Sequence, residues 1–269
     1  VLAFALTTRQ AYAYDIVGPS HALNSLSLAS MAMQAGGTVG SLASGVLIGA
    51  FGPGWLYVVV GVSYIAATVV LLGTGPIVES VKAHRESILS NLAGYVRIIR
   101  ENRILLVLMC LASITEVLGF THMTLLPVFA KEVLFVGPVG LGVMTAVRQG
   151  GGFVGLTLLA SLRDYRRKGM LMFVIAGAFG LALMAFSLST NLFFFLAVLA
   201  VVNACAMAVD TLYKALMQEN VAEEERGRAM GSWVLSIGTA PVGHLGVGGL
   251  SGLLGARRAL LLNGGVLAF

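Results

Sequence analysis

Three charged residues stand deep inside apolar stretches of this sequence: Glu116, Arg148 and Asp210. Even a lenient scale sets the cost of such a charge at the centre of a membrane helix at about 2.5–3.5 kcal/mol, so each is a functional candidate. If the stretches are helices, Glu116 lies about 18 Å and Arg148 about 21 Å from the same face. We predict that both face one cavity, with Glu116 either a proton carrier whose proton affinity depends on Arg148 or half of a static ion pair.

Two further positions could take part in this chemistry. Lys214 follows Asp210 by four residues, the spacing of neighbouring side chains on a helix. The pair is interpreted as a gate or, preferably, as a local salt bridge, because Lys214 is close enough to the end of its stretch to reach water. His122 and His244 can titrate near physiological pH, but a lone histidine on such a helix is more often a hydrogen-bonded packing residue.

Signatures of an enzyme are missing from the sequence. Cys110 and Cys205 lie in separate stretches, and there is no CxxC pair, HExxH motif, phosphate loop or nucleotide fingerprint. Ser236 and His244 are eight residues apart, about 12 Å along one helix, which is too far for a serine hydrolase pair. We therefore expect no catalytic residues, no metal and no cofactor.

The composition decides which elements position these residues. Hydrophobic residues make up 58% and charged residues 11% of the chain, and the mean hydropathy is +0.92, as in an integral membrane protein. The apolar runs lack the alternation of a membrane β-barrel, so we predict an all-α membrane protein. Runs of about 20 residues cross a bilayer, and we predict seven complete spans and a partial one at each end: 22–49, 54–75, 104–130, 138–162, 169–189, 191–216 and 228–254, with 1–8 and 258–269.

Lysine and arginine are distributed unevenly over the loops. Of the 17, 13 lie in loops or at span ends on one face, three lie on the other, and Arg148 lies deep within a span. Because these residues mark cytoplasmic loops, the first face is predicted to be cytoplasmic. This topology accounts for the net charge of +5, so we expect no binding of nucleic acid, which would need a soluble basic domain.

The longest polar segment, residues 79–103, divides the chain. Apolar residues recur in it at helical spacing, which predicts an amphipathic helix on the membrane surface, acting as a linker or, alternatively, as a lipid-sensing element. We predict a first helical bundle over 1–78 and a second over 104–269.

The chain end also repeats its beginning at an offset of 204 residues, with Asp15, Gly45 and a further apolar run matched by Glu219, Gly249 and their successors. Such internal symmetry is common in transport proteins.

Small residues mark the surfaces where helices are expected to meet. They recur three or four residues apart in the first full span, and small side chains let helix backbones approach closely in lipid. The equivalent region of the second copy contains a proline and more glycines. We predict packing and rocking surfaces, rather than substrate contacts, at Gly36, Gly37, Gly40, Gly45, Pro241 and Gly243.

Three motifs together resemble the major facilitator superfamily, and in particular its bacterial efflux branch of enterobactin-type siderophore and macrolide exporters. The first is LPVFA at 126–130 with GLG at 140–142, and the second is the basic loop ASLRDYRRKG at 160–169. The third is QENV at 218–221 followed by ERGRAMG at 225–231 and APVG at 240–243. The resemblance covers nearly the whole chain. One departure is Ser41, where antiporters of the family usually have proline.

The resemblance implies a fold of two six-helix bundles. Residues 1–8 then correspond to the end of helix 4, the seven full spans to helices 5–11, and 258–269 to the start of helix 12. It also implies that a loop motif of this family caps and pairs with neighbouring helix ends and stabilises one conformation; here the motif comprises Arg163, Asp164, Arg166, Arg167 and Gly169. We expect a fragment of a twelve-helix parent that does not transport alone.

From these observations we expect a proton-linked exporter of small amphipathic molecules that works by alternating access. The alternative is a non-coupled facilitator or a transporter-like membrane sensor. The expected partners are membrane lipid, a small-molecule substrate and protons, and the expected state is a monomer that crosses the bacterial cytoplasmic membrane several times.

Overall fold

A computed structural model describes residues 22–73, 102–162, 165–221 and 226–269. The chain divides into two compact units, residues 1–85 and 86–269. Every regular element in the described ranges is helical. The expected position of the amphipathic segment lies almost wholly outside these ranges, as does the predicted partial span at 1–8.

The first unit contributes one helical hairpin. It consists of α2 (Ala22–Phe51) and α3 (Pro53–Gly73), joined at Gly52. Gly52 has a φ of +82°, a conformation that suits glycine, and Pro53 begins α3 where its missing N–H is not needed. The side chains of α3 are almost all exposed, and the Phe51 and Trp55 rings meet edge to face beside the turn.

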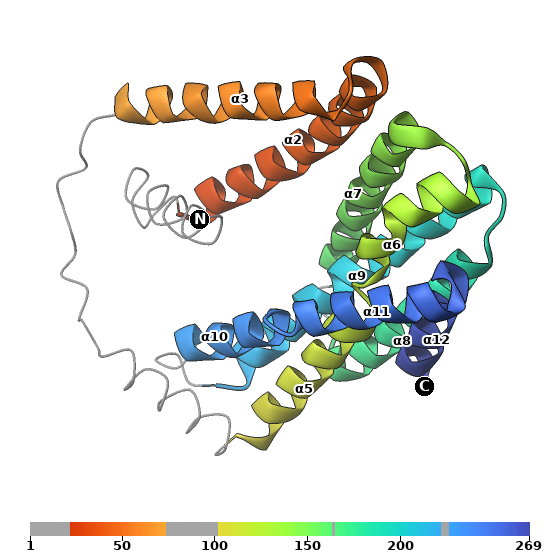
Figure 1. Cartoon of the computed structure of the whole chain (residues 1–269). Helices are drawn as coiled ribbons and strands as arrows, with labels where there is room; N and C mark the ends of the chain where they lie inside the picture. The colour runs from red at the N-terminus through yellow and green to blue at the C-terminus, as the bar shows by residue number, and fades with distance from the viewer. Residues whose placement is uncertain (1–21, 74–101, 163–164, 222–225) are drawn as a thin grey trace. The chain divides into compact units, whose positions relative to one another are not determined.

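The second unit is a bundle of helices around an apolar core (Figure 1). Its longest helices are α7, α8 and α9; α9 packs against both others, and α8 also packs against α12. In chain order the elements are α5 (Arg103–Leu118), α6 (His122–Val128), the π-helix η2 (Phe129–Val133), α7 (Gly137–Ser161), α8 (Lys168–Leu188), α9 (Leu192–Glu219), α10 (Arg226–Ile237), α11 (Ala240–Leu254) and α12 (Ala256–Ala268).

Two predicted spans are interrupted. The span expected at 104–130 turns at Gly119–Thr121 between α5 and α6, and the span expected at 228–254 turns at Gly238–Thr239 between α10 and α11. In both turns a threonine hydroxyl donates to a preceding carbonyl, Thr121 to Leu118 and Thr239 to Ser236, which competes with the helical pattern. The other span boundaries agree with the sequence within a few residues.

Prolines explain the shape of the segments that follow these turns. Pro127 lies inside α6 and has no N–H to continue the ladder, and the chain then widens into the π-helix Phe129–Val133. Pro241 instead stands in the first turn of α11, where a missing N–H is tolerated.

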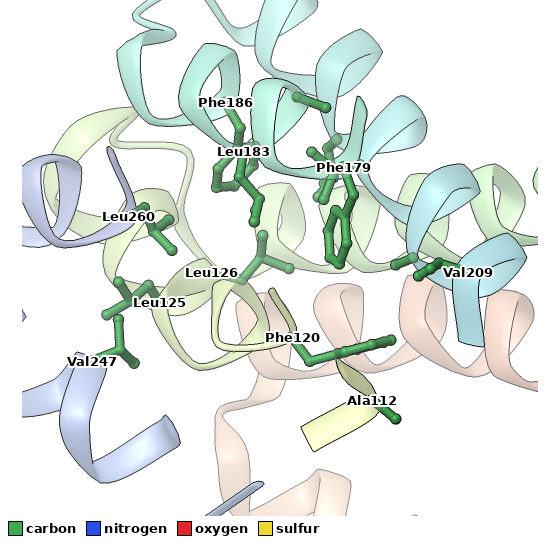
Figure 2. Close-up of a cluster of buried hydrophobic side chains, with 14 of the residues drawn as sticks. Ala112, Phe120, Leu125, Leu126, Phe179, Leu183, Phe186, Val209, Val247 and Leu260 are labelled. Carbon is green, nitrogen blue, oxygen red and sulfur yellow. The ribbon is translucent and has the colours of Figure 1, made fainter. Parts of the chain in front are cut away.

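An aromatic cluster fills the core near the end of the bundle where α8 leads into α9. Phe129, Phe186 and Phe195 lie with ring centroids 4.4–5.5 Å apart and are fully buried. Figure 2 shows Leu126 and the ring of Phe179 directed into the same interior space. Buried side chains from seven α-helices, from η2 and from the turn at Phe120 thus fix the relative positions of the described elements in this unit.

Glycines let α7 and α9 touch backbone to backbone. A Cβ on Gly151 would lie 2.3 Å from the carbonyl oxygen of Ala200, and one on Gly155 would lie 2.2 Å from that of Ala204. The two glycines are four residues apart and so are the two alanines, the pattern that brings membrane helices into close contact.

Four described helical segments are long and apolar enough to cross a membrane: Pro53–Val70, Arg103–Val133, Lys168–Leu188 and Leu192–Glu219. A shorter apolar helix covers Ala35–Phe51. The predicted span over α7 is as long as these but less apolar, since it contains Arg148, Gln149 and many glycines.

Candidate functional site

A small pocket opens between α5, α9 and α10 in the second unit. Its empty volume is about 220 Å³, and it contains both carboxylates that the sequence places inside spans, Glu116 and Asp210. Aromatic and hydroxyl side chains complete it. The lining residues are Ala112, Thr115, Glu116, Phe120, Asp210, Tyr213, Trp233, Ser236 and Ile237.

Asp210 is the centre of a three-residue cluster on one wall of the pocket. Its Oδ2 atom lies 2.8 Å from Lys214 Nζ, so the salt bridge suggested by the spacing of four is present. Its Oδ1 atom accepts a hydrogen bond of 2.8 Å from the indole N–H of Trp233. The Lys214 ammonium also lies 4.1 Å from the centroid of the Trp233 ring, a cation–π contact. The cluster therefore links α9 to α10.

Trp233 was missed by the sequence analysis. It stands on α10, far in sequence from Asp210, and helical spacing identifies neighbours only within one helix. One signal was available: an indole N–H inside an apolar helix needs an acceptor, and intramembrane acceptors are few.

Glu116 differs from Asp210 in having no partner. Within the described ranges no side chain forms an ion pair or hydrogen bond with its carboxylate, which is half-buried on the pocket wall next to Asp210. The pocket thus holds one neutralised and one unneutralised carboxylate.

The expected pairing of Glu116 with Arg148 is wrong. The Arg148 guanidinium donates to the sulfur of Met123, at 3.2 Å, and Met123 belongs to α6, beyond the turn at Gly119–Thr121. Depth along two helices fixes only the height of a side chain and not the direction in which it points. The turn between α5 and α6 separates the part of the chain that faces Arg148 from the part that carries Glu116.

Buried hydroxyl groups hold the pocket walls together. Thr115 of α5 and Tyr213 of α9 share a hydrogen bond of 2.9 Å, and both are almost fully buried. Ser236 of α10 donates to the carbonyl of Met109 on α5, at 3.1 Å. Each bond crosses between helices, so the three walls are joined to one another by polar contacts.

His122 is a packing residue in this structure. It is fully buried; its Nδ1 atom lies 2.7 Å from the carbonyl oxygen of Gly119, and its ring meets Phe179 and Phe186 edge on. His244 of α11 lies with Nδ1 2.7 Å from the hydroxyl of Thr124 on α6. Neither histidine belongs to the pocket lining. Among the described residues no group of three or more His, Cys, Asp and Glu side chains is arranged to hold a metal ion.

The basic loop lies at the opposite end of α8 from the aromatic cluster. Arg163 and Asp164 fall outside the described residues, whereas Arg166 and Arg167 are exposed and Gly169 stands in the first turn of α8. The neighbouring Lys168 forms an ion pair with Glu219 at the end of α9. The observed link between helix ends is therefore made by Lys168, which belongs to the loop ASLRDYRRKG but is not one of the residues to which the pairing role was assigned.

The family comparison agrees with this helical architecture. The family model described as Major Facilitator Superfamily matches residues 1–240 of the chain. The chain belongs to the Major Facilitator Superfamily. It is accordingly a multi-pass membrane protein of a transporter family, and members of that family are transporters and not enzymes. No curated protein and no solved structure matches the chain significantly.

The packing candidates of this superfamily member occupy different environments. Gly36, Gly37 and Gly40 are exposed or half-buried on α2, and a Cβ on Gly36 or Gly40 would meet nothing within 4 Å, whereas Gly45 is buried. In the second unit, a Cβ on Gly243 would lie 2.6 Å from the carbonyl oxygen of Val117. Pro241 stands in the first turn of α11, two residues before Gly243, which lies against α5.

Proposed function

We propose that this protein is a proton-coupled exporter of small amphipathic molecules, siderophore-like or drug-like, working by alternating access in the bacterial cytoplasmic membrane. Its two helical bundles, 1–78 and 104–269, are joined by the linker 79–103. Family membership supports transport. The resemblance of three motifs to those of siderophore and macrolide exporters supports the outward direction. Lipid, substrate and protons are its proposed partners, and the proposed state is a monomer.

One observation carries the proposal of proton coupling: two carboxylates line the pocket, and among the described side chains only Asp210 is paired with a cation, Lys214. Asp210 is paired with Lys214, while Glu116 has no partner within the described ranges. With both carboxylates ionised, the group carries a net charge of −1. A single proton bound at Glu116 makes the group neutral, and no other residue has to move for that to happen.

Charge balance then connects protonation to conformation. A neutral pocket is enclosed inside the membrane at a lower cost than a charged one. Protonated Glu116 favours the conformation in which helices close over the pocket, and ionised Glu116 favours the one in which the pocket meets water. If substrate enters only when the pocket is ionised, protons move inward as substrate moves outward.

The experiment is a flux measurement in inverted membrane vesicles containing the complete gene product. Ethidium serves as a fluorescent amphipathic probe and an enterobactin-type siderophore as a second one, each with and without an imposed proton gradient. Gradient-dependent accumulation in the vesicles is the expected result. Equilibration that ignores the gradient would assign the protein to the non-coupled facilitators, and binding of a probe without flux would assign it to the sensors.

A further inference from the structure

We propose that the end of the second bundle where α8 begins binds an anionic phospholipid. An acyl chain lies in an apolar groove and the headgroup phosphate lies on a basic shelf beside it. The site involves other helix faces than the carboxylate pocket and does not depend on the proposed proton coupling.

The groove runs over α9 between the ends of α7 and α8. It is an open surface groove with a cavity volume of about 260 Å³. Leucine and alanine side chains form most of it, and the hydroxyl of Thr211 already donates to the carbonyl of Met207 on its own helix. The lining residues are Leu156, Leu159, Ala160, Leu162, Lys168, Leu171, Thr211, Leu212 and Ala215.

A second depression of about 760 Å³ adjoins the groove and has the opposite character. Arg166, Arg167 and Lys168 line it, together with the phenol of Tyr165 and the carboxylate of Glu219. Glu219 is paired with Lys168, so the two arginines remain as cations without an ion pair among the described residues. The described residues that line the shelf therefore carry a net charge of +2. A guanidinium group can donate two parallel hydrogen bonds to the oxygens of one phosphate.

Lys168 lines both depressions, so the apolar groove leads directly to the basic shelf. An apolar cleft that ends at two unpaired arginines fits a molecule with a hydrocarbon chain and a phosphate at one end. The shelf also lies on the face that the loop charges assign to the cytoplasm, where anionic lipid attracts basic side chains. A free phosphate would use the arginines and leave the groove unfilled.

The positive charge of the basic shelf further selects among phospholipids. Phosphatidylglycerol offers a net negative charge, whereas phosphatidylcholine of the same chain length places a cation beside the arginines. Each basic side chain at an anionic surface contributes about 1 kcal/mol, so two arginines predict a preference of about 30-fold for phosphatidylglycerol.

Native mass spectrometry of the detergent-purified complete gene product, with equimolar phosphatidylglycerol and phosphatidylcholine of identical chains, tests the shelf. The double variant Arg166→Gln/Arg167→Gln is expected to lose the preference of about 30-fold. The matched control is Arg257→Gln/Arg258→Gln, which removes two exposed arginines at the start of α12 and is expected to keep it. An undiminished preference in the first variant would overturn the proposal.

The groove is tested by filling it. Ala160→Trp places a large side chain in the groove. It is expected to weaken phosphatidylglycerol binding about tenfold, because the acyl chain loses part of its apolar contact with the groove. The control Leu158→Trp changes an exposed neighbour that does not line the groove. Two results together would overturn the proposal. Glycerol phosphate would displace phosphatidylglycerol as well as a second lipid molecule does, and Ala160→Trp would bind phosphatidylglycerol as tightly as the control. The site would then be one for free anions.

Discussion

The side chains around Asp210 define what the pocket can do at the scale of single residues. Its carboxylate receives a salt bridge from Lys214 and a hydrogen bond from Trp233 and is only partly exposed. Glu116 lies on the same pocket without such partners. Two carboxylates in similar surroundings therefore differ: Asp210 holds α9 to α10, and Glu116 is the proton carrier of the proposed function.

Replacement of Lys214 by methionine tests the first of these roles. The variant keeps the bulk over Trp233 but leaves the Asp210 charge without its cation, which we expect to destabilise the protein by about 1–3 kcal/mol. Adding Asp210→Asn removes the unpaired charge and is expected to recover part of the loss. Thermal unfolding of the three proteins in detergent measures the coupling, and strictly additive effects would contradict the cluster.

The indole of Trp233 makes two contacts that one substitution can separate: its ring lies against Lys214, and its N–H donates to Asp210. Trp233→Phe keeps an aromatic face for Lys214 and removes the hydrogen bond to Asp210, for an expected loss of about 1 kcal/mol. Trp55→Phe, at an exposed position beside the α2–α3 turn, is the control. Equal melting temperatures for both variants would show that the hydrogen bond contributes nothing.

Two pairs of helices in this protein make their close contacts at glycine residues, which have no side chain. The contact between α7 and α9 depends on Gly151 and Gly155, and that between α8 and α12 on the close approach of Gly180 and Gly264. In the apolar environment of a membrane, such close contact replaces the hydrophobic effect as the force that holds helices together. Element positions should consequently respond strongly to single methyl groups.

Gly155→Ala and Gly150→Ala are expected to act in opposite directions. At Gly155 the added methyl group collides with the backbone of Ala204, and the expected cost is about 1–3 kcal/mol. At Gly150 it meets nothing within 4 Å, and alanine stabilises a helix by about 0.5–1 kcal/mol over glycine. Thermal unfolding distinguishes the two, and a shift of the same sign in both variants would refute the close contact.

The sequence predicted the elements better than it predicted their interruptions. Apolar run length located all the described spans, because crossing a bilayer imposes a length that any sequence must meet. The turns at Gly119–Thr121 and Gly238–Thr239 were missed, since their flanking residues are as apolar as the helices. The salt bridge of Asp210 was predictable from spacing in one helix, whereas the directions in which Glu116 and Arg148 point depend on helix rotation, which spacing does not determine.

The two ends of the chain are related at the scale of the whole molecule. The α2–α3 hairpin turns at Gly52 with φ +82°, and the α11–α12 hairpin turns at Gly255 with φ +83°. The two glycines lie within one residue of the offset of 204 found in the sequence. The matching positive φ of the turn glycine in both units agrees with duplicated bundles, the arrangement that transporters of this superfamily use for alternating access.

Alanine at either turn glycine should therefore have the same effect. Gly52→Ala and Gly255→Ala both force a side chain into a left-handed conformation, and we expect each to cost about 1–2 kcal/mol. Gly252→Ala, inside α11 with nothing within 4 Å, is the control and should cause no loss. Unfolding temperatures compare the three, and loss at only one turn would argue against equivalent hairpins.

Proton movement through the Glu116 carboxylate tests the central claim most directly. We would record dye-reported proton flux and ethidium accumulation in inverted vesicles that contain the complete gene product, its Glu116→Gln variant, or the control Glu132→Gln, which makes the same change at an exposed position in η2. Our account predicts that Glu116→Gln abolishes gradient-driven accumulation and its pH dependence while Glu132→Gln preserves both. Normal, pH-dependent accumulation in Glu116→Gln would contradict it.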